Sequence, residues 1–236
     1  MCGHLYLVST PIGNLEDFTF RAVKILSGVD IIFAESVERT KKLLSHYDID
    51  AKVISLNKDN EKRKIKNAIA CLKDSKSIAL VSDAGTPCVS DPGFYLLSNL
   101  DEEIKVIPIP GVSSITCALS VSRIPMNEFT FLGFLPKKEN DRKKKLLQAS
   151  STELPLCLFE SKHRLLNLLE DISLLFGEDT MVGLFREMTK IYETITHKSV
   201  VEHIDELKKN TPKGEFVVII APNRHIEIEK PYISII

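Results

Sequence analysis

Short apolar runs alternate with amphipathic stretches along the first half of the chain. The apolar runs predict strands, and the stretches between them, where apolar residues recur every three or four positions, predict helices. The predicted strands are Leu5–Ser9, Asp30–Ala34, Val53–Leu56, Ile78–Ser82 and Lys105–Pro108, and the predicted helices are Thr19–Leu26, Thr40–Tyr47, Glu61–Lys73 and Phe94–Asn99. A further helix is expected after Gly111, with Ser113 or Ser114 as its N-cap. Such alternation is typical of a parallel sheet with helical crossovers.

The second half resumes the alternation after a break. Arg123–Asn127, which contains Pro125, is the best candidate for a domain boundary. The later strands are predicted at Phe129–Leu132, Leu156–Phe159, Met181–Phe185, Tyr192–Thr196 and Phe216–Ala221, and the later helices at His163–Phe176 and Val200–Lys208. The run Phe216–Ile220 is apolar without alternation, as expected for a strand buried on both faces. We therefore predict two α/β lobes, residues 1–122 and 123–236, with a ligand cleft between them.

Composition and charge narrow the possible functions. The 236 residues carry a net charge of −1, so any binding to nucleic acid must come from local patches. The five cysteines are scattered and form no CxxC pair, which argues against a zinc site and against a disulfide framework. No apolar run approaches the roughly 20 residues of a membrane span, and no signal segment precedes the first strand. We expect a cytoplasmic protein with no metal and no membrane attachment.

The loop Ser82–Gly93 is the most informative segment of the chain. It follows a predicted buried strand and holds two Gly, two Pro and two Asp, too many breakers for a helix or a strand. Ligands bind outside the carboxyl ends of the strands in open α/β sheets, and glycine lets backbone groups approach a ligand closely. The loop is therefore a candidate binding site.

Two further Pro/Gly loops, Ser9–Leu15 and Ile109–Ser114, follow other predicted strands of the same half. The first of them lacks GxGxxG, and the chain has no GxxxxGK[ST], so neither a dinucleotide fingerprint nor a phosphate loop is supported. Each loop alone is explained equally well as a simple turn. Three of them at one edge of a parallel sheet favour a binding site.

The motifs Thr10–Leu15, Ser82–Pro87, Asp91–Gly93 and Pro110–Ser114 resemble those of the tetrapyrrole methylase superfamily of S-adenosylmethionine-dependent methyltransferases. They are most similar to the branch that methylates a ribose 2′-hydroxyl of a cytidine in 16S rRNA. Gly133–Pro136, Phe159–Arg164, Arg186–Lys190 and Lys213–Phe216 also fit that branch. The resemblance implies a two-lobed fold with the methyl donor between the lobes, 16S rRNA or the small ribosomal subunit as acceptor, and a homodimer.

The resemblance also implies which residues bind the donor. They are Pro11, Ile12, Gly13, Asp83, Ala84, Gly85, Ser113, Ser114, Phe159, Glu160, Lys213 and Gly214. Asp83, Ala84 and Gly85 would line the donor with backbone groups. Ser113 and Ser114 would hold its carboxylate end, which suits a helix N-terminus because that end attracts anions. His163 and Arg164 are expected to order the wall of the cleft.

Four residues are candidates for catalysis. A ribose hydroxyl is a weak nucleophile, so a general base, or a lysine that lowers its pKa, would help. Glu35, Glu187 and Lys190 are the candidates for these roles, and Arg186 or Lys190 could instead hold a flanking phosphate. For Arg186, Glu187 and Lys190 the alternative is a surface ion pair at helical spacing.

The basic run Pro136–Lys145 is the expected RNA contact. It carries six basic and two acidic residues, the kind of local positive charge that RNA binding needs. The basic members are Lys137, Lys138, Arg142, Lys143, Lys144 and Lys145. The alternative is the solvated start of a helix.

One segment departs from the branch. The branch usually has Glu-Asp-Thr-Arg after the second strand, whereas this chain has Glu35-Ser36-Val37-Glu38, with Arg39 one position late. We expect Arg39, or else Lys41, to take over the RNA contact. Two other functions stay open: methyl transfer to a small tetrapyrrole, and donor-dependent RNA binding without catalysis. The branch's extra C-terminal segment is expected to be absent or reduced here, and the apolar stretch Tyr232–Ile236 could serve a partner surface.

Overall fold

The computed structural model describes residues 2–210 and 213–222, and it divides into two compact units. The first unit is Met1–Val121 together with Glu187–Thr194, and the second is Ser122–Arg186 together with Ile195–Ile236. The predicted boundary lies one residue from the first crossing between the units, but Glu187–Thr194 returns to the first unit, which a single boundary does not capture. The stretch Tyr232–Ile236 lies outside the described residues.

The first unit contains a five-stranded parallel sheet in the order β3-β2-β4-β1-β5. Its strands are β1 (His4–Val8), β2 (Ile31–Ala34), β3 (Val53–Ser55), β4 (Ile78–Val81) and β5 (Lys105–Ile109). Its helices are the 3-10 turn η1 (Leu15–Asp17), α1 (Phe20–Gly28), α2 (Val37–His46), α3 (Glu61–Lys73), α4 (Phe94–Leu97) and α5 (Ser114–Ser120). All five strands predicted for this half, and their parallel pairing, are confirmed.

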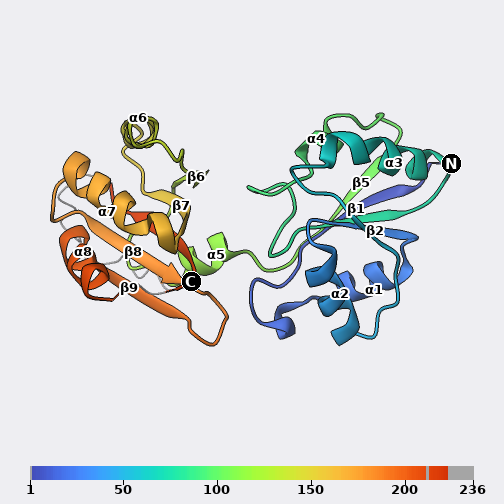
Figure 1. The fold of residues 1–236 in the computed structure, drawn as a ribbon, viewed down its shortest axis with the longest axis horizontal. Coiled ribbons are helices and arrows are strands. Elements are labelled where there is room, and N and C mark those ends of the chain that lie inside the picture. The colour runs from blue at the N-terminus through green and yellow to red at the C-terminus, as the bar shows by residue number, and fades with distance from the viewer. Residues whose placement is uncertain (1, 211–212, 223–236) are drawn as a thin grey trace, which may run out of the picture. The chain divides into compact units, whose positions relative to one another are not determined.

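The helices cover both faces of this sheet, with α1 and α2 on one face and α3 and α4 on the other (Figure 1). Neighbouring strand residues point to opposite faces, which explains why both β2 and β4 are buried along their whole length. Ile32 and Ala34 pack in the α1/α2 core, whereas Ile31 and Phe33 pack in the α3/α4 core. The sheet is therefore the central layer of a three-layer unit.

One helix of this unit begins earlier than predicted, and another begins at a predicted cap. The helix α2 begins at Val37 rather than Thr40, because Ser36 is its N-cap and its hydroxyl accepts a hydrogen bond from Arg39 N. Ser113 is the N-cap of α5 by its backbone angles, but its side chain makes no capping hydrogen bond.

The second unit contains a mixed sheet in the order β6-β7-β10-β8-β9. Its strands are β6 (Thr130–Phe134), β7 (Leu156–Ser161), β8 (Met181–Arg186), β9 (Thr194–Ser199) and β10 (Glu215–Ile220), and its helices are α6 (Glu139–Ser150), α7 (Lys162–Phe176) and α8 (Val200–Lys209). β10 runs antiparallel to β7 and β8, whereas β6 and β7 are parallel. Phe216–Ile220 is buried throughout, as its uninterrupted apolar pattern predicts. No helix within the described ranges combines the length and apolarity needed to cross a membrane.

The loop between β4 and α4 contains Asp91, a partly buried acid. Burial raises the pKa of Asp91 to about 6, and the Glu35 carboxylate adds to the rise. Lys58 and a hydrogen bond from Ser82 oppose it. The folded loop therefore favours the protonated form of Asp91.

Replacing Asp91 by Asn should change how stability depends on pH. An unfolded Asp titrates near pH 4, and the folded one near pH 6, so the native state binds more protons between these values. Relative to Asp91→Asn, the wild type should lose free energy of unfolding as the pH rises from about 4 to about 6, and stay level above that. Urea unfolding of both proteins across this range measures the difference. A constant difference across the whole range would contradict the raised pKa.

Candidate active site

The loops that follow β1 and β4 are joined by a reciprocal pair of backbone hydrogen bonds. Thr10 N donates to Gly85 O at 2.9 Å, and Gly85 N donates to Thr10 O at 3.0 Å. The Thr10 hydroxyl also donates to Ser82 O at 3.1 Å, and the hydroxyls of Ser9 and Thr86 lie 3.0 Å apart. β1 and β4 are parallel neighbours in the sheet, so their loops begin side by side, and beyond the sheet Thr10 and Gly85 form an isolated antiparallel bridge. The two predicted ligand loops form one connected structure.

Gly85 is the point where all three Pro/Gly loops meet. Its φ is +80°, a backbone conformation that favours glycine. A Cβ atom at this position would lie 3.5 Å from Ile12 Cγ2 and 3.9 Å from Val112 O. The third loop takes part because β5 lies on the other side of β1 from β4. A Cβ atom alone would make ordinary van der Waals contacts here, so the positive φ is what favours glycine, and only a longer side chain would fill the space between the loops.

The Asp83 carboxylate is bound by two residues at the start of α2. Ser36 N donates to Asp83 Oδ1 at 3.0 Å, and the Arg39 guanidinium lies 3.1 Å from Asp83 Oδ2. Asp83 N in turn donates to Glu35 Oε2 at 3.4 Å. The side chain of Asp83 thus fixes the loop to α2.

A cavity of about 70 Å³ opens between the first loop, α2 and the loop after β4. It is lined by Thr10, Pro11, Arg39, Thr40, Leu43, Ser82 and Asp83. The Arg39 side chain is 68 % exposed, whereas Glu38 points elsewhere and pairs with Lys42. At the segment that departs from the branch, the structure therefore places Arg39 at the cavity.

The segment Glu187–Thr194 packs against the first loop within the first unit. Asn14 N donates to Thr189 Oγ1 at 3.1 Å, and a Cβ atom on Gly13 would overlap Lys190 Cγ. The Lys190 ammonium donates to Glu187 Oε1 at 3.1 Å. The ion pair proposed as the alternative for these residues is present, but it lies in a turn with left-handed backbones at Glu187 and Thr189 rather than on a helix.

Arg186 belongs to the second unit, although it precedes Glu187 in the chain. Its Nε donates to Lys213 O at 2.6 Å. Two of the other catalytic candidates, Glu187 and Lys190, meet at the first loop, whereas Glu35 lies beside Asp83.

The donor residues expected in the second unit lie at one end of two neighbouring strands, β7 and β10. Glu160, near the end of β7, lies beside the start of β10, because it pairs with Phe216 in the antiparallel register. Lys213 and Gly214 immediately precede β10, so they lie at the same end. The Phe159 ring packs edge-on against Phe131, with 5.1 Å between the ring centroids.

Glu160 is a buried acid in this group. Ser161 N donates to Glu160 Oε1 at 2.8 Å, and an Arg164 guanidinium nitrogen lies 3.3 Å from Glu160 Oε2. Burial raises the pKa of the Glu160 carboxyl, and the hydrogen bond from Ser161 and the charge of Arg164 oppose the rise.

The basic run forms the start of a helix, α6, and its residues are not equivalent. Lys137, Lys138, Lys144 and Lys145 are exposed. Arg142 is buried, because it shares one helix face with Leu146 and Ala149, and its Nε donates to Asp171 Oδ2 at 2.6 Å. This position corrects the expectation that Arg142 lies on the RNA-facing surface. Asp171 was missed, although an acid on the face that carries Leu168 and Ile172 in the helix Lys162–Phe176 is a signal for a buried partner.

Comparison with known proteins places these features in a family. The model of the tetrapyrrole (corrin/porphyrin) methylases matches residues 4–204. A protein of Halalkalibacterium halodurans named ribosomal RNA small subunit methyltransferase I is 44% identical over 94% of this chain and 76% of its own length. The proteins of the same name from Escherichia coli O157:H7 and Thermotoga maritima are each 42% identical, over 97% and 93% of this chain and 81% and 98% of their own lengths.

Solved structures agree with this at the level of the fold. The methyltransferase CobJ has a TM-score of 0.71 at 15% identity, covering 93% of this chain and 94% of that one. The cobalt precorrin-4 methyltransferase CbiF has a TM-score of 0.67 at 16% identity, covering 93% and 95%. The two α/β units are thus those of a known fold. With a family model that matches most of its length and relatives that align with nearly all of it, the chain belongs to the tetrapyrrole methylase family.

Proposed function

We propose that this protein transfers a methyl group from S-adenosylmethionine to the ribose 2′-hydroxyl of a cytidine in 16S rRNA of the small ribosomal subunit. The observation that carries the proposal is the sequence identity of 42–44% to proteins named ribosomal RNA small subunit methyltransferase I. The three loops that meet at the carboxyl ends of the parallel strands, two of them joined by hydrogen bonds, support it, since ligands bind at that end in such sheets.

The loops of the first unit fit a methyl donor. Ser36 and Arg39 bind the Asp83 carboxylate, Asp83 N donates to Glu35, and both backbone groups of Gly85 pair with Thr10. A donor at this loop would therefore be contacted by the groups outside these bonds, the Asp83 carbonyl and Ala84 N. When bound, S-adenosylmethionine supplies a methyl group already activated by its sulfonium. The chain's task is then to orient donor and acceptor, which replaces a bimolecular encounter by a positioned one.

The residues beside the first loop suit the acceptor. Lys190 and Glu187 are held as an ion pair against Gly13 and Asn14, where they would lower the pKa of a ribose hydroxyl or take its proton. Arg39 carries a mostly exposed positive charge at the neighbouring cavity, which suits an RNA phosphate. Arg186, the second unit's donor residues and the homodimer stay predictions from the family resemblance, and the cytoplasmic location stays a prediction from the sequence composition.

The direct test is methyl transfer to small ribosomal subunits from a strain that lacks this gene. With labelled S-adenosylmethionine, nucleoside analysis should find 2′-O-methylcytidine. Wild-type protein that binds the donor but leaves every RNA unmethylated would contradict the proposal. It would favour the alternative function, donor-dependent RNA binding without catalysis. Methyl transfer to a tetrapyrrole in place of the subunit, seen as a change in visible absorption, would favour the other open function.

Gly85→Arg should abolish donor binding. A side chain there is strained at the positive φ and fills the space beside Ile12 and Val112, so calorimetry should show a loss in affinity of at least about 100-fold. Gly28→Arg is the matched control, because a Cβ at Gly28 meets no atom within 4 Å. Equal donor affinity in both variants would remove the loop from the binding site.

Lys144→Glu combined with Lys145→Glu should weaken binding to the subunit and spare donor binding. Both side chains are exposed on α6, and loss of two phosphate contacts should lower the slope of log affinity against log salt by roughly 2. The control is Arg63→Glu with Lys66→Glu, which makes the same change of charge on the exposed side of α3. If both pairs weaken binding equally, the effect comes from net charge and the α6 surface is not the contact.

A further inference from the structure

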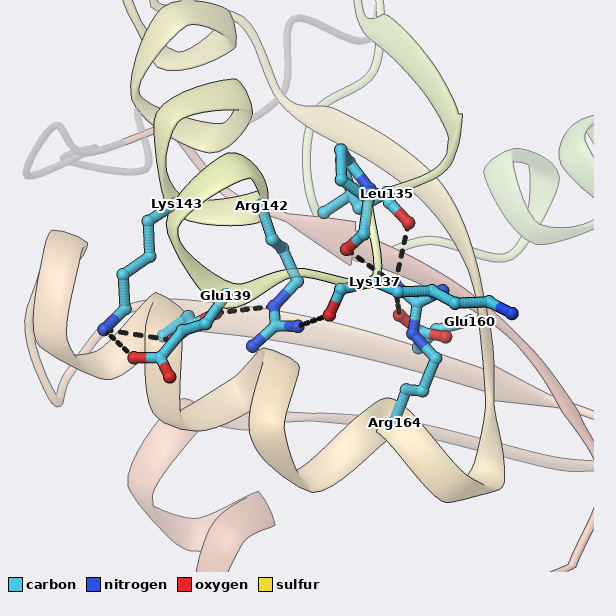
Figure 2. Close-up of polar contacts among 9 residues, drawn as sticks. Leu135, Lys137, Glu139, Arg142, Lys143, Glu160 and Arg164 are labelled. Carbon is cyan, nitrogen blue, oxygen red and sulfur yellow. Dashed lines mark hydrogen bonds and ion pairs between the residues drawn. The ribbon is translucent and has the colours of Figure 1, made fainter.

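The connection between β6 and α6 is held by two arginine side chains. We call Leu135–Lys138, which joins the strand to the helix, the basic loop. Arg164 donates from one guanidinium nitrogen to Leu135 O at 2.7 Å and Pro136 O at 3.1 Å, and Arg142 donates to Lys137 O at 3.3 Å. Figure 2 shows the two guanidinium groups reaching this loop from α6 and α7. Three successive carbonyls of the basic loop are thus bound by arginine.

Each of these arginines has a buried carboxylate partner. Arg142 and Asp171 are both 6 % exposed and pair at 2.6 Å, and Arg164 pairs with Glu160, whose side chain is fully buried. Buried ion pairs are weak devices for stability, because apolar side chains of similar volume often stabilise a fold as well or better. Arg142, buried with its partner, and Arg164, whose side chain is 22 % exposed, therefore need another reason to lie here, and the loop carbonyls supply one.

Asp171, the partner of Arg142, also restrains the first turn of α6. Lys143 reaches Asp171 Oδ1 at 3.5 Å and pairs with Glu139 one turn earlier (Figure 2). Asp171 thus ties together two successive basic residues of α6. The helix start and the basic loop are held to α7 as one frame.

Four exposed lysines stand on this frame: Lys137 and Lys138 on the loop, and Lys144 and Lys145 on the helix. Flexible cationic segments lose conformational freedom when they bind, which reduces affinity, and a pre-ordered backbone avoids part of that loss. Arginine suits this task because its planar fork donates to a carboxylate and to a carbonyl at once, whereas lysine has a single charged nitrogen.

We propose that Arg142 and Arg164 are positioning residues for RNA: they hold the basic loop so that its lysines meet the RNA backbone in a fixed arrangement. Neither arginine contacts RNA. The inference rests on the proposed function, since it takes the small ribosomal subunit as the acceptor. Arg142 is the residue to test, because the partner of Arg164 is Glu160, a candidate for donor binding.

The test variant is Arg142→Met combined with Asp171→Leu. It replaces the buried ion pair by an apolar pair, so urea unfolding should show stability at or above that of the wild type. The hydrogen bond to Lys137 O is lost all the same. We expect the KM for the subunit to rise roughly tenfold, with kcat and donor affinity unchanged. A stable double variant with wild-type KM would overturn the proposal, because a merely structural ion pair would then explain Arg142.

Two further measurements separate positioning from direct contact and from charge alone. The slope of log affinity against log salt should be the same for the double variant and the wild type, because the exposed lysines are intact. A fall of roughly one in that slope would mean that Arg142 itself contacts a phosphate, which would overturn its positioning role. Arg142→Lys keeps the charge beside Asp171 but not the fork, so its KM should stay raised, and full rescue would also overturn the proposal. If wild-type protein methylates no subunit, the proposed function fails; if it does and only these KM values are normal, this inference alone fails.

Discussion

The pairing of Thr10 with Gly85 is the contact on which the candidate site depends. It is an antiparallel bridge outside the parallel β1–β4 ladder, and it joins two loops far apart in sequence into one structure. β5 flanks β1 on the other side, which brings the third loop to the same edge. Glycine at position 85 suits the positive φ of this bridge, and the Asp83 carboxylate fixes the joined loops to α2.

The fold of the first unit was largely readable from the sequence, for a physical reason. A strand buried on both faces, such as Ile31–Ala34 or Ile78–Val81, must be an uninterrupted apolar run, and such runs are conspicuous between polar turns. The order of those strands explains why the three loops meet. That order depends on where each crossover places the next strand, which a pattern of apolar residues does not encode.

Site residues whose positions depend on contacts between distant parts of the chain could not be placed from the sequence. Arg142 reads as one more member of a basic run, and only the helix that places it beside Leu146 and opposite Asp171 shows that it is buried. Position 39 is a similar case, since Ser36 starts the helix and thereby directs Arg39, rather than Glu38, toward Asp83. In both cases the residue type supplies the charge, and the residue's position on its helix decides which partner that charge meets.

The return of Glu187–Thr194 to the first unit has a consequence for how such chains can vary. The backbone passes between the units three times, after Val121, after Arg186 and after Thr194. The surface beside Gly13 and Asn14 is therefore completed by residues that follow it at a distance of 175 positions along the chain. The two units are not interchangeable modules, and a recombination event that swapped the second half of the coding sequence would also replace one wall of the first unit's loop.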